Sequence, residues 1–333
     1  MHVGILGAGA IGCTVGARLA HGGARVTLVG RPRIRDALAE GITLTRWGES
    51  PVRVPAEHTT FETEPAALCA CDVVLVTVKT QDTAAAVAPL VDALPAATPV
   101  ASLQNGLEAA SVLRDALPQH DVWPGMVPFN IVWADPHTLH QGTSGAIVLP
   151  PAGAAVVHAL RAGGCPAKTH RAVEAVQRGK LLLNLNNAVN ALAGLPLREQ
   201  LTRRAYRRIL ADVIDEGRAI FRAAGLGVKG VGLMQPALAP RVLRLPDLLF
   251  FRVASAMISI DPHARSSMQD DLRRGRPTEV DALNGTMVRL GQAHGHGAPL
   301  QRRLVELVHE AERAGGSPEL SATALAERLY QSL

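Results

Sequence analysis

The sequence predicts an α/β protein in which a doubly wound parallel sheet is followed by a mainly α-helical domain. In the first third of the chain, short apolar runs alternate with helix-like segments, and strands separated by helices form parallel sheets with right-handed crossovers. After about residue 171, long helical patterns replace the strand signals. We therefore predict an N-terminal α/β domain over residues 1–171 and a helical domain over residues 172–333.

The elements of the sheet are predicted in chain order. Apolar runs at Val3–Leu6 and Arg25–Val29 flank a helix over Ile11–His21. Later strands are predicted at Asp72–Val78, Pro99–Leu103, Asp121–Asn130, Ile131–Trp133 and Ala146–Leu149, and an Ala-rich helical stretch at Thr83–Leu94. The helical pattern of the second half predicts helices over Ala172–Leu192 and Arg203–Ala224.

Composition narrows the class of protein. The 333 residues are 47% hydrophobic and 19% charged, which is typical of a globular enzyme. Only 3% are aromatic, so few rings can stack on bases, and no nucleic-acid partner is expected. The net charge of +5 favours small anionic molecules.

The cysteines and the N-terminal residues are used to predict the cellular compartment. The four cysteines have no paired spacing, which indicates reduced thiols packed as small apolar groups. Met1 leads directly into an apolar strand without a basic leader, and no apolar run reaches the roughly 18 residues of a membrane span. We expect a cytoplasmic protein with no membrane partner.

A glycine-rich turn follows the first strand. Residues 3–12 read VGILGAGAIG, and the motif precedes a helix and then a second strand. In a Rossmann-type dinucleotide site the first glycine makes the tight turn, the second admits the pyrophosphate and the third packs the helix against the strand. The helix N-terminus also attracts phosphate. This predicts a cofactor site formed by Gly7, Ala8, Gly9, Ala10, Ile11 and Gly12.

Arg31 lies at the position that distinguishes NADP(H) sites from NAD(H) sites. NAD sites carry an acid at the end of the second strand to bind the ribose hydroxyl, whereas this chain has Gly30 and Arg31 there. A guanidinium can bind a 2′-phosphate. The sequence therefore predicts NADP(H) as the cofactor, the alternative being an arginine that is simply solvated.

The helical domain opens with a polar stripe on an otherwise apolar helix. At about 100° per residue, Lys180, Asn184 and Asn187 fall on one side. An ammonium and two amides are costly to bury without partners, so the stripe fits the wall of a polar pocket. A solvated surface stripe would look the same.

Three further positions are candidates for the site. Asn105 follows the predicted strand Pro99–Leu103, and Lys79 ends the strand Asp72–Val78. Both thus belong to loops beyond the carboxyl ends of strands, where α/β sheets bind ligands. Pro277 and Thr278 suggest a helix start that would hold Glu279 in the first turn. An ordinary Asn-Gly turn and an ordinary helix cap are the structural alternatives.

Taken together, these motifs resemble the ketopantoate reductase (2-dehydropantoate 2-reductase) family over nearly the whole chain. The similarity is carried by GAGAIG from Gly7, Arg31, VTVKT with Lys79, LQNG with Asn105, KLLLN from Lys180, SSMQDD from Ser266, and TEVDALNG from Thr278. Ser267 precedes Glu279 by twelve residues, as the family pattern requires.

The resemblance implies NADPH-dependent reduction of 2-dehydropantoate to (R)-pantoate, on the route to pantothenate and coenzyme A. It assigns Lys180 as the proton donor to the carbonyl oxygen and Glu279 to substrate-hydroxyl binding. It assigns Asn184 and Ser267 to substrate anchoring, and Asn105 to the junction of cofactor and substrate. A cationic donor stabilises the developing alkoxide, so these roles are chemically reasonable.

Two positions depart from the family pattern. Family members carry Asn eight residues after the lysine, where this chain has Ala188, with Asn187 one step earlier. A further Asn about eighteen residues after the lysine is replaced by Arg198. Asn187 and Arg198 are therefore added to the predicted substrate residues, and the substrate could be a different or more acidic 2-oxo acid.

Several other interpretations remain. A non-catalytic NADPH sensor could share the fold, and His263 is the candidate base of a histidine-dependent 2-hydroxyacid dehydrogenase. His294 and His296 lie among glycines in a turn, so no metal site is predicted from them. A small-molecule 2-oxo acid is the expected partner. These motifs do not determine the oligomeric state, for which a homodimer is one alternative.

Overall fold

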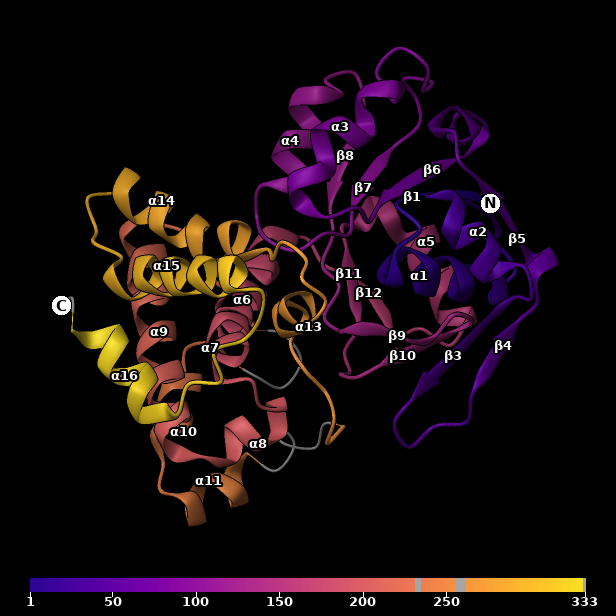
Figure 1. Cartoon of the computed structure of the whole chain (residues 1–333). Helices are drawn as coiled ribbons and strands as arrows, with labels where there is room; N and C mark the ends of the chain where they lie inside the picture. Colours follow the sequence, from indigo (N-terminus) through magenta and orange to yellow (C-terminus); the bar gives the residue numbers. More distant parts are fainter. Residues whose placement is uncertain (231–234, 255–260, 332–333) are drawn as a thin grey trace. The chain divides into compact units, whose positions relative to one another are not determined.

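The computed structural model describes residues 1–230, 235–254 and 261–331 of the chain. The chain divides into two compact units, Met1–Glu174 and Ala175–Leu333. Each unit is described by itself, and Figure 1 gives the labels of the helices and strands in both.

The first unit is built on a six-stranded sheet in which every neighbouring pair is parallel. The spatial order is β5 (Thr59–Glu62), β2 (Arg25–Val29), β1 (His2–Leu6), β6 (Val73–Val76), β7 (Val100–Ser102) and β8 (Val122–Pro124). Numbered within this sheet alone, that is the order 3-2-1-4-5-6 of a dinucleotide-binding sheet, whose direction reverses beside the first strand. The predicted fold class is confirmed.

Both faces of this sheet are buried. Along β1, Val3 and Ile5 belong to one apolar cluster and Leu6 to another, because successive side chains of a strand point to opposite faces. In Figure 1, α3 and α4 lie on one side of these strands, and α1 and α5 on the other. The helices are α1 (Ala10–His21), α2 (Pro32–Leu38), α3 (Thr83–Val87), α4 (Ala109–Ala116) and α5 (Ala154–Ala162).

Two smaller sheets complete the unit. One has the order β4 (Val52–Val54), β3 (Ile42–Arg46), β10 (Thr138–Gln141), β9 (Ile131–Asp135), and the other pairs β11 (Ile147–Leu149) with β12 (Ala167–Thr169). Short 3₁₀ turns cover Ala56–His58, Pro65–Ala70, Thr80–Asp82, Ala88–Leu90 and Pro151–Gly153.

Two predicted elements of the first unit are shorter than expected by more than three residues. The strand predicted over Asp121–Asn130 ends at Pro124, because proline has no amide hydrogen to continue the ladder and Gly125 turns against the backbone of the neighbouring strand. A Cβ at Gly125 would lie 2.5 Å from the Ser102 carbonyl oxygen. The helix predicted over Thr83–Leu94 is α-helical only to Val87.

The described part of the second unit is helical. Its helices are α6 (Val173–Asn184, beginning two residues before the unit boundary), α7 (Asn186–Ala193), α8 (Leu197–Thr202), α9 (Arg204–Ala223), α10 (Ala239–Arg244), α11 (Asp247–Val253), α13 (Ser267–Arg273), α14 (Thr286–Ala293), α15 (Pro299–Ala314) and α16 (Ala322–Tyr330). A π-helical turn over Asp281–Gly285 leads into α14.

Helix α7 is the core of this unit. Its residues from Ala188 to Leu192 are all fully buried, as expected for a short helix covered on every side. The predicted single helix Ala172–Leu192 is therefore two helices, α6 and α7, separated at Leu185. The predicted Arg203–Ala224 corresponds to α9 within one residue at each end.

None of the described helices is both long and apolar enough to cross a bilayer. The four cysteines are free, and three of them, Cys13, Cys71 and Cys165, are buried, as packed thiols would be.

Candidate active site

The glycine turn of the first unit has the geometry that each glycine was predicted to serve. Gly7 has a φ of +108°, and a Cβ there would lie 2.7 Å from the Val78 amide nitrogen. A Cβ on Gly12 would lie 2.2 Å from the Gly7 carbonyl oxygen, whereas a Cβ on Gly9 would have no neighbour within 4 Å. Gly7 and Gly12 are thus required by the fold itself, while Gly9 leaves open space beside the backbone.

The turn is fixed to its neighbouring strands. The amides of Gly7 and Ala8 both donate to the Val29 carbonyl at the end of β2, each at 2.9 Å. Thr77, which follows β6, donates from Oγ1 to the Gly7 carbonyl at 2.7 Å. Helix α1 then begins at Ala10 without a side-chain cap, so its first amide groups are left to bind an anion.

Arg31 lies at the carboxyl end of β2 and is exposed. Its strand comes close to the turn, since a Cβ on Gly30 would lie 2.5 Å from the Ala8 Cβ. Within the described residues, no hydrogen bond or ion pair engages the Arg31 guanidinium, while Arg35 in the next turn stacks 5.7 Å from the Phe61 ring. Arg31 is therefore available to an anion near the glycine turn.

Lys79 and Asn105 follow adjacent strands, β6 and β7, and both are partly buried. Their loops are tied together, because Thr80 donates from Oγ1 to the Asn105 carbonyl at 2.8 Å. The buried Gln104 adds hydrogen bonds to the Val78 carbonyl at 3.0 Å and to Thr83 Oγ1 at 2.7 Å. The glycine turn, Lys79 and Asn105 thus follow the carboxyl ends of β1, β6 and β7, and the sheet order reverses between β1 and β6.

In the second unit, Lys180 and Asn184 are one helical turn apart near the end of α6, and both are partly buried. Asn187, also partly buried, belongs to α7. Leu185 between the helices keeps right-handed helical angles and donates to the Leu181 carbonyl at 3.0 Å. The predicted stripe consequently crosses from α6 to α7.

Burial and a carboxylate act in opposite directions on the Lys180 ammonium. Desolvation lowers the pKa of Lys180 to about 8, and the negative charge of Glu279 raises it in part. The two predicted catalytic residues, 99 positions apart in the chain, are therefore close enough to interact electrostatically. A lysine with this pKa is charged at neutral pH and can release its proton readily.

Glu279 was predicted in the first turn of a helix. In the structure the helical residues start at Val280, so Glu279 directly precedes them. The Thr278 hydroxyl accepts a hydrogen bond from the Val280 amide at 3.3 Å, and the Leu283 amide donates to the Glu279 carbonyl at 3.0 Å. Thr278 therefore ends the preceding loop, and Glu279 is held between two buried residues, Thr278 and Val280.

Ser267 is the first residue of α13 and is partly buried. The helix is capped by its neighbour Ser266, whose Oγ accepts from the Gln269 amide at 3.1 Å. Ser266 also donates from its amide to Asn190 Oδ1 at 3.0 Å and from its hydroxyl to the Asn187 carbonyl at 3.4 Å. Ser267 is thereby held next to the start of α7.

The comparisons with known proteins cover both units. The family described as "Ketopantoate reductase PanE/ApbA" matches residues 3–154, and its C-terminal counterpart matches residues 172–312. A 2-dehydropantoate 2-reductase from Mycobacterium tuberculosis is 30% identical over 94% of this chain and 99% of its own length.

The chain belongs to the ketopantoate reductase family.

Solved structures agree with this assignment. A PanE/ApbA family ketopantoate reductase from Ralstonia eutropha JMP134 is 32% identical, covers 95% of this chain and 99% of its own, and superimposes with a TM-score of 0.79. A D-mandelate dehydrogenase determined with NADH and anilino(oxo)acetate shares the fold, with a TM-score of 0.76 over 95% of this chain and 99% of its own, at 19% identity. The predicted family and the predicted class, an oxidoreductase, are confirmed.

The two positions that depart from the family pattern lie in different surroundings. Ala188 is fully buried in α7, and Arg198 is exposed on α8. Gln200 of α8 donates to Asn186 Oδ1 at 2.8 Å and accepts from Asn190 Nδ2 at 2.9 Å. In this ketopantoate reductase family member, buried amides near the site thus satisfy one another and hold α7 against α8.

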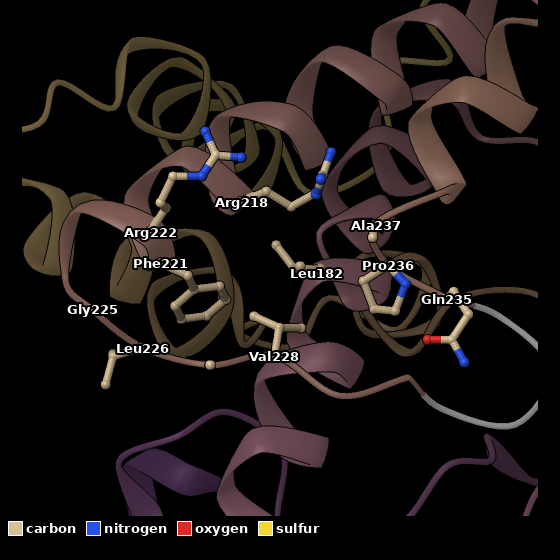
Figure 2. Close-up of a pocket in the computed structure, with 11 residues that line it drawn as sticks. Leu182, Arg218, Phe221, Arg222, Gly225, Leu226, Val228, Gln235, Pro236 and Ala237 are labelled. Carbon is tan, nitrogen blue, oxygen red and sulfur yellow. The ribbon is translucent and has the colours of Figure 1, made fainter.

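A pocket of about 420 Å³ in the second unit is separate from these residues. Figure 2 shows Arg218 and Arg222 along one side of it, with Leu182 and Phe221 near its wall. Leu182 follows Lys180 by two positions and so points about 200° away around α6. The full lining is Leu182, Arg218, Phe221, Arg222, Gly225, Leu226, Gly227, Val228, Gln235, Pro236 and Ala237.

Three histidines were weighed from the sequence. His263 and His294 are exposed, and His296 bonds the neighbouring Gly297 carbonyl. Sequence reasoning missed Thr77 and Gln104, which fix the turn and the loops, and also His309 and Glu312. Thr77 and Gln104 could have been found from their positions directly beyond β6 and β7. The His-x-x-Glu spacing of His309 and Glu312 is a weak signal, because it is common on surface helices.

Proposed function

We propose that this protein reduces 2-dehydropantoate to (R)-pantoate with NADPH, in the route to pantothenate and coenzyme A. The observation that carries the proposal is the partly buried Lys180, whose pKa is lowered to about 8 by burial while Glu279 opposes that change. Such an ammonium is a suitable proton donor to a carbonyl oxygen at neutral pH. Membership of the ketopantoate reductase family supports the substrate.

The residues of the first unit fit the cofactor. The space beside Gly9, the uncapped start of α1 and the available Arg31 would hold the pyrophosphate and a 2′-phosphate. Lys79 and Asn105 are proposed to contact the cofactor from the loops beyond β6 and β7. NADPH, when bound, supplies the hydride that adds to the carbonyl carbon.

The residues of the second unit would carry out the protein's share of the reaction. Lys180 Nζ donates a hydrogen bond to the carbonyl oxygen and transfers a proton to it as the C–O double bond becomes a single bond. Glu279 keeps Lys180 charged before the transfer and binds the substrate hydroxyl. Asn184, Asn187 and Ser267 are proposed as anchors for the substrate.

A different 2-oxo acid is the alternative substrate, and the replacements at Ala188 and Arg198 favour it. If Arg198 is a substrate residue, its positive charge suits a more acidic compound. A non-catalytic NADPH sensor is the remaining alternative from the sequence. The expected small-molecule partner is a 2-oxo acid, and a homodimer is the proposed assembly if the chain associates.

The direct test is NADPH oxidation, followed by its absorbance, with 2-dehydropantoate and a panel of 2-oxo acids. We expect 2-dehydropantoate to have the highest kcat/KM, and a higher value for another acid would transfer the proposal to that acid. Lys180→Ala should lower kcat about a hundredfold or more with little change in NADPH affinity. Tight NADPH binding without turnover of any acid would favour the sensor.

A further inference from the structure

A histidine and a glutamate of α15 contact both ends of the segment that carries Glu279. Glu312 Oε1 accepts a hydrogen bond from the Thr278 amide at 2.7 Å. His309 Nε2 lies 3.2 Å from Asp281 Oδ1, and its Nδ1 lies 2.8 Å from Glu312 Oε2. One continuous chain of contacts therefore runs from residue 278 through α15 to residue 281, with Glu279 between its ends.

The contacts from α15 meet the segment at its two ends, where burial changes to exposure. Thr278 and Val280 are buried, but Asp281 is exposed and opens the π-helical turn Asp281–Gly285. A π-helical turn is less favourable than an α-helix and is found often at functional sites. The contacts from Glu312 and His309 restrain the backbone on either side of Glu279 and the exposed start of this turn.

Helix α15 itself is well anchored at its other end. The amides of Leu300 and Gln301 each donate at 3.0 Å to the carboxylate of Glu216 on α9. Gln301 also accepts from Asn284 Nδ2 at 2.9 Å, at the far side of the π-helical turn. Because α15 is held to α9, its His309 and Glu312 provide a fixed support for the segment.

The contact between His309 and Glu312 shifts their pKa values in opposite directions, each toward the charged form. Partial burial lowers the pKa of His309, and the hydrogen bonds with Glu312 and Asp281 outweigh it, so that the pKa is raised. Desolvation raises the pKa of Glu312, and the Thr278 amide and His309 outweigh it, so that this pKa is lowered. The other nearby charges, Arg313 and Arg289, contact the main chain of His309 and Asp281 respectively.

We infer that His309 and Glu312 are positioning residues that hold Glu279 beside Lys180. The inference rests on the proposed function for its catalytic meaning, but its physical content is the electrostatic effect of Glu279 on Lys180. If the contacts to Thr278 and Asp281 are lost, Glu279 moves more freely and its average distance from the ammonium increases. Lys180 then loses part of the stabilisation of its charged form.

The contacts of His309 and Glu312 with the Glu279 segment are all present only over a defined range of pH. A charged imidazole donates from both nitrogens, one to each carboxylate. Its pKa is raised, so both contacts persist below that value and one is lost as pH rises through it. Glu312 has a lowered pKa, so its contacts fail only as pH falls through that value. Between the two, the support is complete.

The test measures the pKa of Lys180 directly, from the pH dependence of its acylation by acetic anhydride, read by peptide mass spectrometry. His309→Ala should lower this pKa, in the same direction as Glu279→Gln and by no more. The double variant should match Glu279→Gln alone. The matched control is His294→Ala, an exposed histidine after α14, which should leave the pKa unchanged.

A folded His309→Ala protein with an unchanged Lys180 pKa would overturn the inference. If that variant does not fold, Asp281→Asn and Glu312→Gln, which keep the side-chain shapes, decide the question by the same measurement. In the steady state, the alkaline limb of kcat/KM should move to lower pH in His309→Ala, whereas a loss of stability alone would not move it. A wild-type protein that fails to reduce 2-dehydropantoate would refute the proposed function, and the Lys180 titration would still test the positioning role.

Discussion

Gly9→Ala separates the role of the glycine turn in binding from its role in folding. A Cβ at this position meets no atom within 4 Å, and Gly9 has extended backbone angles, φ −88° and ψ −168°, that alanine also adopts. The unliganded protein should therefore change in stability by no more than about 1 kcal/mol. In a unit of this size that corresponds to a shift of roughly 2–4 °C in Tm.

The same methyl group should obstruct the cofactor. It occupies the space through which a pyrophosphate would reach the amides at the start of α1. Loss or lengthening of one or two hydrogen bonds to a charged phosphate costs about 1.5–3 kcal/mol. Since each 1.4 kcal/mol is about tenfold in affinity, Kd for NADPH should rise about ten- to a hundredfold.

The assay is NADPH binding by fluorescence or calorimetry, alongside thermal unfolding without ligand. Gly316→Ala is the matched control, because a Cβ there also meets nothing within 4 Å and the residue lies in the other unit. Gly12→Ala should instead lower both Tm and affinity, since its Cβ would lie 2.2 Å from a carbonyl oxygen. Wild-type NADPH affinity in a folded Gly9→Ala protein would refute the assignment of this space to the pyrophosphate.

Three further predictions concern charged residues. Because Lys180 must be protonated to act as a donor and its pKa is about 8, kcat/KM should be flat below that pH and fall about tenfold per unit above it; a pH profile without this limb would contradict the donor role. Arg31→Ser should weaken NADPH binding and leave NADH binding nearly unchanged, measured as the ratio of the two Kd values, and equal losses for both would count against a 2′-phosphate contact. Arg207 is fully buried, stacks 3.9 Å over the Phe250 ring and donates to Asp247 and four carbonyls, so Arg207→Leu should destabilise the protein by about 3 kcal/mol or more in a denaturant titration. The exposed Arg208→Leu should change stability by less than about 0.5 kcal/mol, and a similar effect in both would contradict the role of burial.

The local sequence pattern was sufficient to predict an element whose bounds depend on neighbouring residues alone. Val3–Leu6 and Ile11–His21 were predicted and correspond to β1 and α1 within one residue at either end, because hydrophobic period and glycine spacing are properties of neighbouring residues. Of the sheet of β4, β3, β10 and β9, only the strand at Ile131–Trp133, within β9, was predicted. The sheet joins residues 42–54 to residues 131–141, and a short strand acquires its hydrogen bonds only from a partner that the local pattern does not identify.

The predicted helix over Ala172–Leu192 is interrupted at one position. Leu185 separates α6, which carries Lys180, from α7, in which every residue except Asn187 is buried. The sequence has no glycine or proline there to mark a break. The same limit applies to His309, whose role depends on Asp281 from a different helical segment.

The sequence by itself determined the fold class, the family and the position of the glycine turn, since these follow from local hydrophobic patterns and from short motifs and their order along the chain. It also named Lys180 and Glu279 as candidates, but only the tertiary structure brought their charges together. The folded chain alone decided the Lys180 pKa, the open space at Gly9 and the support of Glu279 by α15. The reason is physical: desolvation and charge interactions depend on which residues surround a group in space, and that surrounding is assembled from segments far apart in the chain.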